Sequence, residues 1–501
     1  MVRALRHIHN AGLILTMAMF FQDYALAQFC INPGSSVTIK HGTSLYLGTD
    51  LLIRSTAGGS GYLVDQGLPG AVQLTGSLVV ERYVGQSGWH NIAAPVGNAH
   101  SSLFSGTDLF FYYDETIVQN DWNFGWVWYS GPLSALHGYD VFLDNNPITV
   151  AYTSTNPNHL NTGPFSASVS LTNAPDGEIP QHKGWNLLGN PYPSPVDWLS
   201  PAGWDKTAIN DAKYIWDPAN EVYTIFVGGS NPIGINGGTR FIPSNQGFWV
   251  QATANGMLQV NNAVRVGQTL NTPEYYKKDE NTYPVLRLTA SGNGYSDESV
   301  VRFLDGTHPG FDRDFDALKI FGKNAKVPQL GSLAEGMILS VNTLGEMSEG
   351  LTLPLYFYVG TDGLYEIQMS SNLIGMDCYI FDIVTDRLVR IDDYTPYHFI
   401  HKPSYPNNRF TLVFDPDINQ LAAMGKLFTV FACNGNITIL NSHEKPVTVT
   451  VTIHDMIGRL MRSEQLFLAS TYTFYPGLQR GYYVVSLVAG ESASRHKLYI
   501  E

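Results

Sequence analysis

The amino-acid sequence predicts an all-β protein made of several domains. Charged residues make up only 14% of the chain and aromatic residues 12%, and the sequence holds 48 glycines and 27 prolines. Short runs of β-branched and aromatic residues alternate with polar residues and are separated by Gly, Pro, Asn and Asp, which is the pattern of strands joined by turns. A chain of 501 residues is too long for one ordinary domain, so we expect roughly three or four.

Residues 1–27 have the three parts of a secretory signal peptide. Arg3 and Arg6 form a basic start, residues 11–21 are apolar, and residues 25–27 (Ala-Leu-Ala) are a small-residue cleavage site. The apolar run is too short to span a bilayer, and no later run is longer, so we expect no transmembrane segment in the mature chain. The chain is therefore predicted to be exported through the secretory pathway.

Residues 28–80 predict a short β-solenoid or β-meander that caps the next domain. Small strand-like runs alternate with glycine-containing turns at short intervals, as they do in solenoid coils and meanders. The block is too short to be stable alone. The strand-like runs are residues 36–39, 44–47, 50–53 and 77–80.

Residues 81–265 predict a tryptophan-rich β domain, because all nine tryptophans lie there. Residues 88–96 and 184–193 echo each other: each starts with Gly-Trp, continues as an apolar run and closes at proline. The block ends with residues 245–252, Asn-Gln-Gly-Phe-Trp-Val-Gln-Ala. The tryptophans expected to pack in the core or in turns are Trp185, Trp198 and Trp249.

Residues 266–420 predict a jelly-roll-like β-sandwich, because alternating runs are separated by turns of Gly, Asn and Asp. A linker at about residues 416–426 leads to the last block. Cys378 in this block and Cys433 beyond it could form a disulfide in an oxidising compartment, but three cysteines are too few for a disulfide framework. The strand-like runs are residues 284–290, 298–303, 355–359, 379–382 and 409–414.

Residues 427–501 predict a small Ig-like β-sandwich. Several runs alternate with period two and are broken by Gly and Pro. Asp455 and Gly458 indicate a tight turn between two strands, in which glycine supplies a positive φ. Arg459 can pair with Asp455 across this turn.

This last block resembles the type A C-terminal sorting domain of the Bacteroidetes type IX secretion system. The resemblance implies passage across the outer membrane by the type IX secretion machinery, then attachment to surface polysaccharide or release. Residues 184–198 followed by 245–252 resemble a module common in Bacteroidetes surface proteins that carry this sorting domain, and no activity comes with that module. The residues that match the sorting motif are Asp455, Gly458, Arg459, Gly481, Tyr483 and Lys497.

An aromatic run within the tryptophan-rich block is the strongest candidate for ligand binding. Trp122, Phe124, Trp126 and Trp128 are spaced two residues apart, so on a strand all four project from one face. Pyranose rings stack on such indole surfaces, which indicates a sugar-binding strip. The alternative is that this face is the core of a sandwich.

The sequence contains no motif for enzyme, metal or nucleic-acid chemistry. No nucleophile elbow, zinc-binding helix or phosphate-binding glycine loop occurs. Residues 312–316 offer carboxylates to calcium, but Ala317 and Lys323 stand where an EF-hand needs Gly and Glu, and a solvated turn is the simpler interpretation. The net charge of −14, without a Lys or Arg cluster, argues against binding to nucleic acid.

The sequence therefore predicts a secreted or cell-surface protein that is not an enzyme, needs no cofactor or metal, and serves adhesion or the structure of the surface matrix. The alternative is a carbohydrate-binding surface protein that uses Trp122, Trp126 and Trp128. A polysaccharide-degrading enzyme is the least favoured class, and it stays open because a catalytic carboxylate pair is not local in sequence.

Overall fold

The computed structural model confirms the all-β class. It describes residues 28–67, 70–104, 109–117, 125–144, 147–172, 182–267, 283–373, 376–416, 428–433, 435–441, 446–490 and 492–500, and the predicted signal peptide lies outside these ranges. Strands dominate the described chain, and the helical pieces are short 3-10 turns. Among the described residues no helix is long and apolar enough to cross a membrane.

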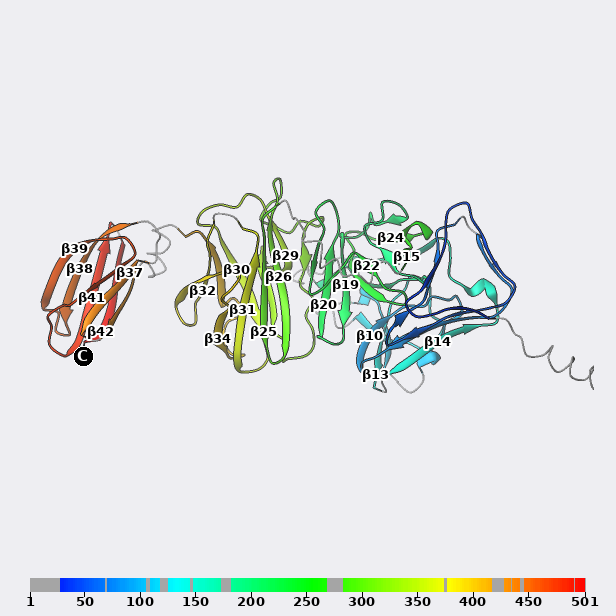
Figure 1. The fold of residues 1–501 in the computed structure, drawn as a ribbon, viewed down its shortest axis with the longest axis horizontal. Helices are drawn as coiled ribbons and strands as arrows, with labels where there is room; N and C mark the ends of the chain where they lie inside the picture. Colours follow the sequence, from blue (N-terminus) through cyan, green and yellow to red (C-terminus); the bar gives the residue numbers. More distant parts are fainter. Residues whose placement is uncertain are drawn as a thin grey trace, which may run out of the picture. The chain divides into compact units, whose positions relative to one another are not determined.

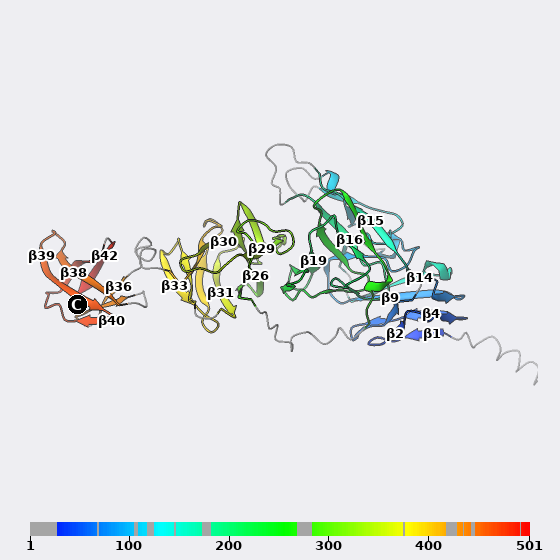
Figure 2. The same cartoon turned by 90° about the horizontal axis from the view of Figure 1, so that it is seen from above.

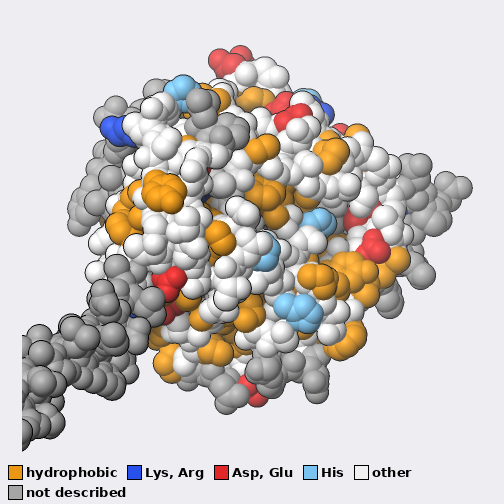
Figure 3. All heavy atoms as spheres, turned by 90° about the vertical axis from the view of Figure 1, so that its right-hand side faces the viewer, with side chains coloured by type: hydrophobic (Ala, Val, Ile, Leu, Met, Phe, Trp, Pro, Cys, Tyr) orange, Lys and Arg blue, Asp and Glu red, His pale blue; other side chains and the backbone are white. Residues whose placement is uncertain are grey.

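The chain forms two compact units (Figure 1). The first comprises residues 1–280 and 313–323, and the second comprises residues 281–312 and 324–501. Residues 313–323, which the sequence groups with the 266–420 block, therefore belong to the first unit. On the face in Figure 3, hydrophobic side chains lie among uncharged polar ones and charged side chains are few, as the low charged fraction of the sequence leads one to expect.

The N-terminal strands of the first unit form a parallel coil, so the solenoid describes them better than a meander, whose neighbouring strands would be antiparallel. Figure 2 shows four of these strands, β1, β2, β4 and β9, close together. The parallel pairs are β1 (Gln28–Ile31) with β4 (Asp50–Ile53), β4 with β9 (Leu78–Val84), β2 (Ser36–Ile39) with β7 (Tyr62–Asp65), and β3 (Leu45–Leu47) with β8 (Val72–Leu74).

Strand β9 connects this coil to the tryptophan-rich part of the first unit. It crosses the predicted boundary at residue 80 and pairs antiparallel with β14 (Ile148–Ser154). One hydrophobic core holds Leu51 and Val80 of the coil together with Val141 and Tyr152. The coil therefore shares a core with the residues that follow it.

Two sheets of the tryptophan-rich part carry the site described below. The two Gly-Trp segments become strands in different sheets, β10 and β16, and an isolated bridge joins Ile92 to Gln246. The first sheet has the order β10 (Gly88–Ile92), β13 (Tyr139–Leu143), β11 (Phe110–Tyr113) and β12 (Trp126–Trp128). The second has the order β16 (Trp185–Gly189), β23 (Gly247–Gln251), β19 (Ala212–Asp217), β20 (Val222–Val227) and β21 (Ile233–Ile235).

A further sheet of the first unit packs on a second core. That core includes Trp198, Phe248 and Leu258, all fully buried. Trp185 and Trp249 are also buried, at 3% and 0% exposure, which confirms the packing role expected for these tryptophans. The sheet consists of β15 (Phe165–Val169), β24 (Gly256–Val260) and β18 (Trp204–Asp205).

The main sheet of the second unit closes over one core, as the strands of a β-sandwich do. Phe357 of β30 contacts Phe399 of β34 with ring centroids 5.2 Å apart, although other strands separate β30 from β34 in the sheet. The strand order is β33 (Arg387–Ile391), β32 (Cys378–Asp382), β35 (Phe410–Phe414), β30 (Thr352–Tyr358), β28 (Gln329–Ala334), β29 (Met337–Leu344), β26 (Tyr295–Phe303), β25 (Val285–Gly292), β31 (Gly363–Ser371) and β34 (Tyr397–His401).

The sandwich core holds a buried ion pair and a buried thiol. Arg409 donates to Asp382 through Nη2 at 2.6 Å and Nε at 2.8 Å, and both side chains are fully buried. Cys378 is a buried free thiol whose pKa burial raises to about 12. The side chain of Cys433, the partner considered for it, lies outside the described residues.

The C-terminal residues of the second unit form a separate small sandwich, as predicted. Its core takes residues from both sheets, among them Ile437, Val451 and Val485, all buried. The three-stranded sheet has the order β36 (Phe428–Cys433), β37 (Asn436–Asn441) and β40 (Thr471–Phe474). The four-stranded sheet has the order β39 (Leu460–Leu468), β38 (Val447–Asp455), β41 (Gly481–Ala489) and β42 (Ser492–Ile500).

Candidate functional site

Two adjoining cavities in the first unit form the candidate site, which we call the Trp216 groove. One cavity has a volume of about 240 Å³ and the other about 100 Å³, and Asn91 and Trp216 line both. We call the larger one the polar cavity and the smaller one the aromatic cavity. Trp216 is the wall that the two have in common.

Strand registers explain how the aromatic cavity forms. Trp89 and Asn91 are two residues apart on β10, so they project from the same face. Asn91 lies opposite Asp140 of β13, and Asn91 Nδ2 donates to Asp140 Oδ1 at 2.8 Å. Trp216 of β19 lies opposite Tyr223 of β20, with ring centroids 5.1 Å apart. The full lining of this cavity is Trp89, Asn91, Trp126, Asp140, Trp216, Glu221, Tyr223, Phe321, Gly322 and Lys323.

Two indole N–H groups in this lining lack an acceptor. Nε1 of Trp126 and Nε1 of Trp216 are buried, and neither donates a hydrogen bond within the described part of the chain. Buried indole N–H groups normally have a partner, because leaving one unpaired costs about 1–3 kcal/mol. Both nitrogens are closed off from solvent, so an acceptor on a bound molecule would reach them only after the indole rings turn.

Asp140 is a carboxyl group of the aromatic cavity whose pKa is strongly shifted. Burial raises its pKa to about 7, against the opposing effects of nearby Lys323 and of the hydrogen bond from Asn91. Burial also raises the pKa of Tyr223, and Asp140 adds to that shift. Near neutral pH the cavity therefore holds a carboxyl group that exchanges its proton with the solvent.

This raised pKa makes the stability of the first unit depend on pH. The unfolded Asp140 ionises near 3.8, so between that pH and about 7 folding takes up a proton, and above 7 folding buries a charge. The contribution of Asp140 to the free energy of unfolding should thus fall by roughly 2–4 kcal/mol between pH 4 and 7, given 1.36 kcal/mol per pKa unit.

Asp140→Asn tests this contribution by urea denaturation at pH 4.5, 6 and 7.5. The variant should gain stability relative to the wild type as the pH rises. A difference between the two proteins that stays constant from pH 4.5 to 7.5 would contradict the assignment. Asp217→Asn is the matched control. The Asp217 side chain is half-buried at the end of β19, and its carboxyl oxygens accept hydrogen bonds from the backbone N–H of Ala219 and from Asn220 Nδ2 in the turn.

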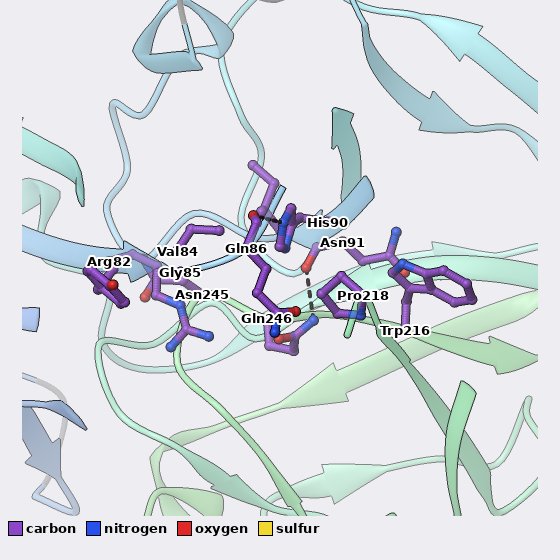
Figure 4. A pocket seen from close by; sticks show the side chains of 12 residues that line it. Arg82, Val84, Gly85, Gln86, His90, Asn91, Trp216, Pro218, Asn245 and Gln246 are labelled. Atoms are coloured by element: carbon purple, nitrogen blue, oxygen red, sulfur yellow. Dashed lines mark hydrogen bonds between the residues drawn. The ribbon is translucent and has the colours of Figure 1, made fainter. Parts of the chain in front are cut away.

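The polar cavity is lined by donors and holds no carboxylate among its described lining residues. Figure 4 shows Gln246 and Asn91 joined by a hydrogen bond, from Gln246 Nε2 to the Asn91 carbonyl at 2.9 Å, and His90 Nε2 bound to the Gln86 carbonyl at 2.9 Å. Burial lowers the pKa of His90, while the Gln86 carbonyl acts to raise it and Arg82 to lower it further. Arg82 is the one lysine or arginine in this lining.

The predicted aromatic strip is divided between the groove and the surface. Trp126 lines the aromatic cavity and packs against Tyr113 and Trp249, at 5.2 Å and 5.5 Å between ring centroids. Trp128, two residues along β12, is 61% exposed and lines neither cavity. Trp122 lies outside the described residues, as does Phe124.

The carboxylates of the Asp312–Asp316 run differ in their burial. Asp316 is fully buried while Asp314 is exposed. Across the described ranges no group of three His, Cys, Asp or Glu side chains could hold a metal ion.

The matched sorting residues lie at a turn and along two strands of the C-terminal sandwich. Asp455 Oδ1 accepts from the backbone N–H of Arg459 at 2.9 Å, and Arg459 Nε donates to Asp455 Oδ2 at 3.1 Å. Gly458 has φ of 85°, so the expected turn geometry is confirmed. Gly481 begins β41, Tyr483 is buried, and Lys497 Nζ lies 4.9 Å from the ring centroid of Tyr482.

The fold and the groove define a multidomain all-β protein with an aromatic cavity beside a polar one. The chain belongs to the family described as Domain of unknown function (DUF8693), whose model matches residues 21–414. The match ends before the C-terminal sandwich. Comparison with curated proteins finds no match.

Five solved chains match in structure. One of them, "Biofilm associated protein - BSP domain", is 10% identical, with 85% of this chain and 90% of that chain covered and a TM-score of 0.15. A TM-score this low supports no argument about fold or function.

Proposed function

We propose that this is an extracellular, non-enzymatic surface protein that mediates adhesion by binding carbohydrate in the Trp216 groove. The observation that carries the proposal is the pair of buried indole N–H groups without acceptors in an aromatic-lined cavity. Sugar rings pack on aromatic faces while their hydroxyl oxygens accept hydrogen bonds, so they match both features of this lining. The two cavities are small, which suits one or two rings of a glycan rather than a folded partner.

Retention of the mature chain on a panel of insoluble polysaccharides tests the proposal. We expect retention on at least one polysaccharide and elution by soluble fragments of the same polymer. If no polysaccharide retains the protein, or if soluble fragments fail to release it, the groove has another ligand.

One observation favours a second candidate function, cleavage of the bound glycan. Asp140, with its pKa raised to about 7, lines the same cavity as the carboxylate Glu221. Glycoside hydrolysis uses a pair of carboxyl groups, one of which is held protonated near neutral pH. Release of reducing ends from the retained polysaccharide, abolished in Asp140→Asn and Glu221→Gln, would establish this function. If no reducing ends appear, binding is the function.

We also propose that the C-terminal sandwich delivers the protein through the type IX secretion machinery. The resemblance of residues 427–501 to the sorting domain supports this delivery, as do the exposed turn at Asp455 and the separate core of the sandwich. Removing residues 427–501 from the full chain should leave the protein in the periplasm of a type IX-competent cell.

The turn offers a sharper test by cell fractionation. Gly458→Val should reduce surface delivery several-fold, because a β-branched residue is strained at φ of 85°. Ser463→Val, on the neighbouring strand β39, is the control and should be delivered normally. Surface delivery of the truncated chain would contradict the proposal.

A further inference from the structure

The lining of the polar cavity indicates which class of glycan the Trp216 groove binds, given the glycan binding proposed above. Arg82 lies on β9 and lines this cavity. Among the described residues its guanidinium makes no ion pair and no hydrogen bond. A partly buried arginine normally pairs with a carboxylate, because an unpaired charge out of water is expensive.

The neighbours of Arg82 do not neutralise it. Its nearest electrostatic partners are Tyr62 and Tyr152, and burial raises the pKa of both phenols, so both are neutral at physiological pH. Burial lowers the pKa of Arg82 itself, but an arginine keeps its charge at neutral pH. The adjacent residue on the strand, Glu81, is occupied by the backbone N–H of Ser55 at 3.0 Å and by Arg54 at 3.9 Å.

Two further donors in the same lining lack acceptors. Trp216 Nε1 and Asn245 Nδ2 are buried without a hydrogen bond, and Asn245 is only 3% exposed. The Asn245 side chain interacts with the Tyr152 hydroxyl but forms no hydrogen bond of normal geometry to it. Asn245 also has φ of 61°, which lies in the left-handed region that residues other than glycine rarely adopt.

We infer that the polar cavity binds the carboxylate of an acidic sugar, with Arg82 as its counter-ion, so the glycan that the groove recognises is an anionic one. A carboxylate has two acceptor oxygens, which suits the paired N–H donors of the Arg82 guanidinium. A phosphate or sulfate ester would present similar oxygens. Trp216 lines this cavity as well as the aromatic one, so the ring that carries the carboxylate can contact the indole.

The test compares acidic polysaccharides with their carboxyl-reduced forms, which differ only in that the carboxylate has become a hydroxymethyl group. The probes are polygalacturonate, alginate and hyaluronate, and sulfated and phosphorylated glycans form a separate arm. The mature chain should bind at least one acidic polymer about 10- to 100-fold tighter than its reduced form, as expected for one charged hydrogen-bonded pair. The preference should weaken as the ionic strength rises.

Arg82→Gln should remove this preference, so that the acidic polymer and its reduced form bind with the same affinity. Arg54→Gln is the matched control, because Arg54 is exposed outside both cavities, and it should keep the preference. Melting temperatures of the variants show whether each one folds.

The possible outcomes distinguish the inferred carboxylate recognition from the proposed glycan binding. Binding that depends on Trp216 but shows no preference for the acidic form overturns the inference and leaves the proposed function standing. A preference confined to sulfated or phosphorylated glycans overturns the carboxylate assignment. Failure to bind any glycan overturns both.

Discussion

Replacing Trp216 by alanine is expected to weaken glycan binding by about 30-fold or more, because truncating an aromatic anchor in a desolvated site typically costs about 2 kcal/mol or more. Trp216 lines both cavities and supplies one of the two unpaired indole N–H groups. The variant should therefore lose stacking surface and a hydrogen-bond donor together. Affinity electrophoresis or calorimetry with the retained glycan measures the loss.

Trp128→Ala is the matched control for this prediction. Trp128 is a tryptophan of the same unit, but it is 61% exposed and lines neither cavity, so its removal should change affinity less than about 2-fold. Trp216→Phe separates the two contributions, because it keeps a stacking ring and removes the N–H. Equal losses for Trp128→Ala and Trp216→Ala would place the binding surface on the exposed strand and not in the groove.

Replacing Arg409 by alanine is expected to destabilise the second unit by about 3–5 kcal/mol, the usual effect of removing one partner of a buried ion pair. The substitution leaves the fully buried Asp382 with the Tyr397 hydroxyl at 2.8 Å but without its counter-ion. It also removes a cation that lies 4.9 Å from the ring centroid of Phe399. Guanidinium denaturation followed at 25 °C measures the change.

The exposed pair Arg390–Asp377 provides the control. Arg390 donates to Asp377 at 2.5 Å, but its side chain is 56% exposed, so Arg390→Ala should change stability by less than about 1 kcal/mol. The double variant Asp382→Leu, Arg409→Met should recover much of the lost stability, since it leaves no unpaired charge. Destabilisation of Arg409→Ala by less than about 1 kcal/mol would contradict the assigned role of the pair.

The same pair predicts how the second unit responds to acid. Burial acts to raise the pKa of Asp382, but the hydrogen bonds from Arg409 and Tyr397 outweigh it and hold the pKa below its ordinary value. A depressed carboxyl pKa stabilises the fold above the unfolded value of 3.8, and this stabilisation is lost as the pH falls through the folded pKa. The Asp140 contribution runs in the opposite direction.

The fold class could be predicted because period-two alternation and turn residues are local in sequence. The choice between solenoid and meander could not, since alternation does not say whether β1 pairs with β4 parallel or antiparallel. The membership of residues 313–323 in the first unit also depends on long-range packing. Phe321 and Lys323 of this segment line the aromatic cavity, and nothing in their local pattern predicts it.

The candidate site could be predicted only in part. The strip identified Trp126, which lines the groove, and the same spacing also selected Trp128, which does not. Trp89 stood out in the sequence only as part of the first of the two similar Gly-Trp segments. Arg82, Asp140 and Trp216 could not be found, because their proximity depends on long-range strand pairing, of β9 with β14, β10 with β13 and β19 with β20.

The central claim, that a glycan supplies acceptors to the indole N–H groups of Trp126 and Trp216, is tested most directly by NMR of the nine indole N–H signals. The protein is labelled with ¹⁵N-tryptophan, and Trp126→Phe and Trp216→Phe identify the two signals. On addition of the retained glycan, these two should move downfield in proton shift by more than the Trp128 signal. If the glycan binds while both signals stay unchanged, the Trp216 groove is not the binding site.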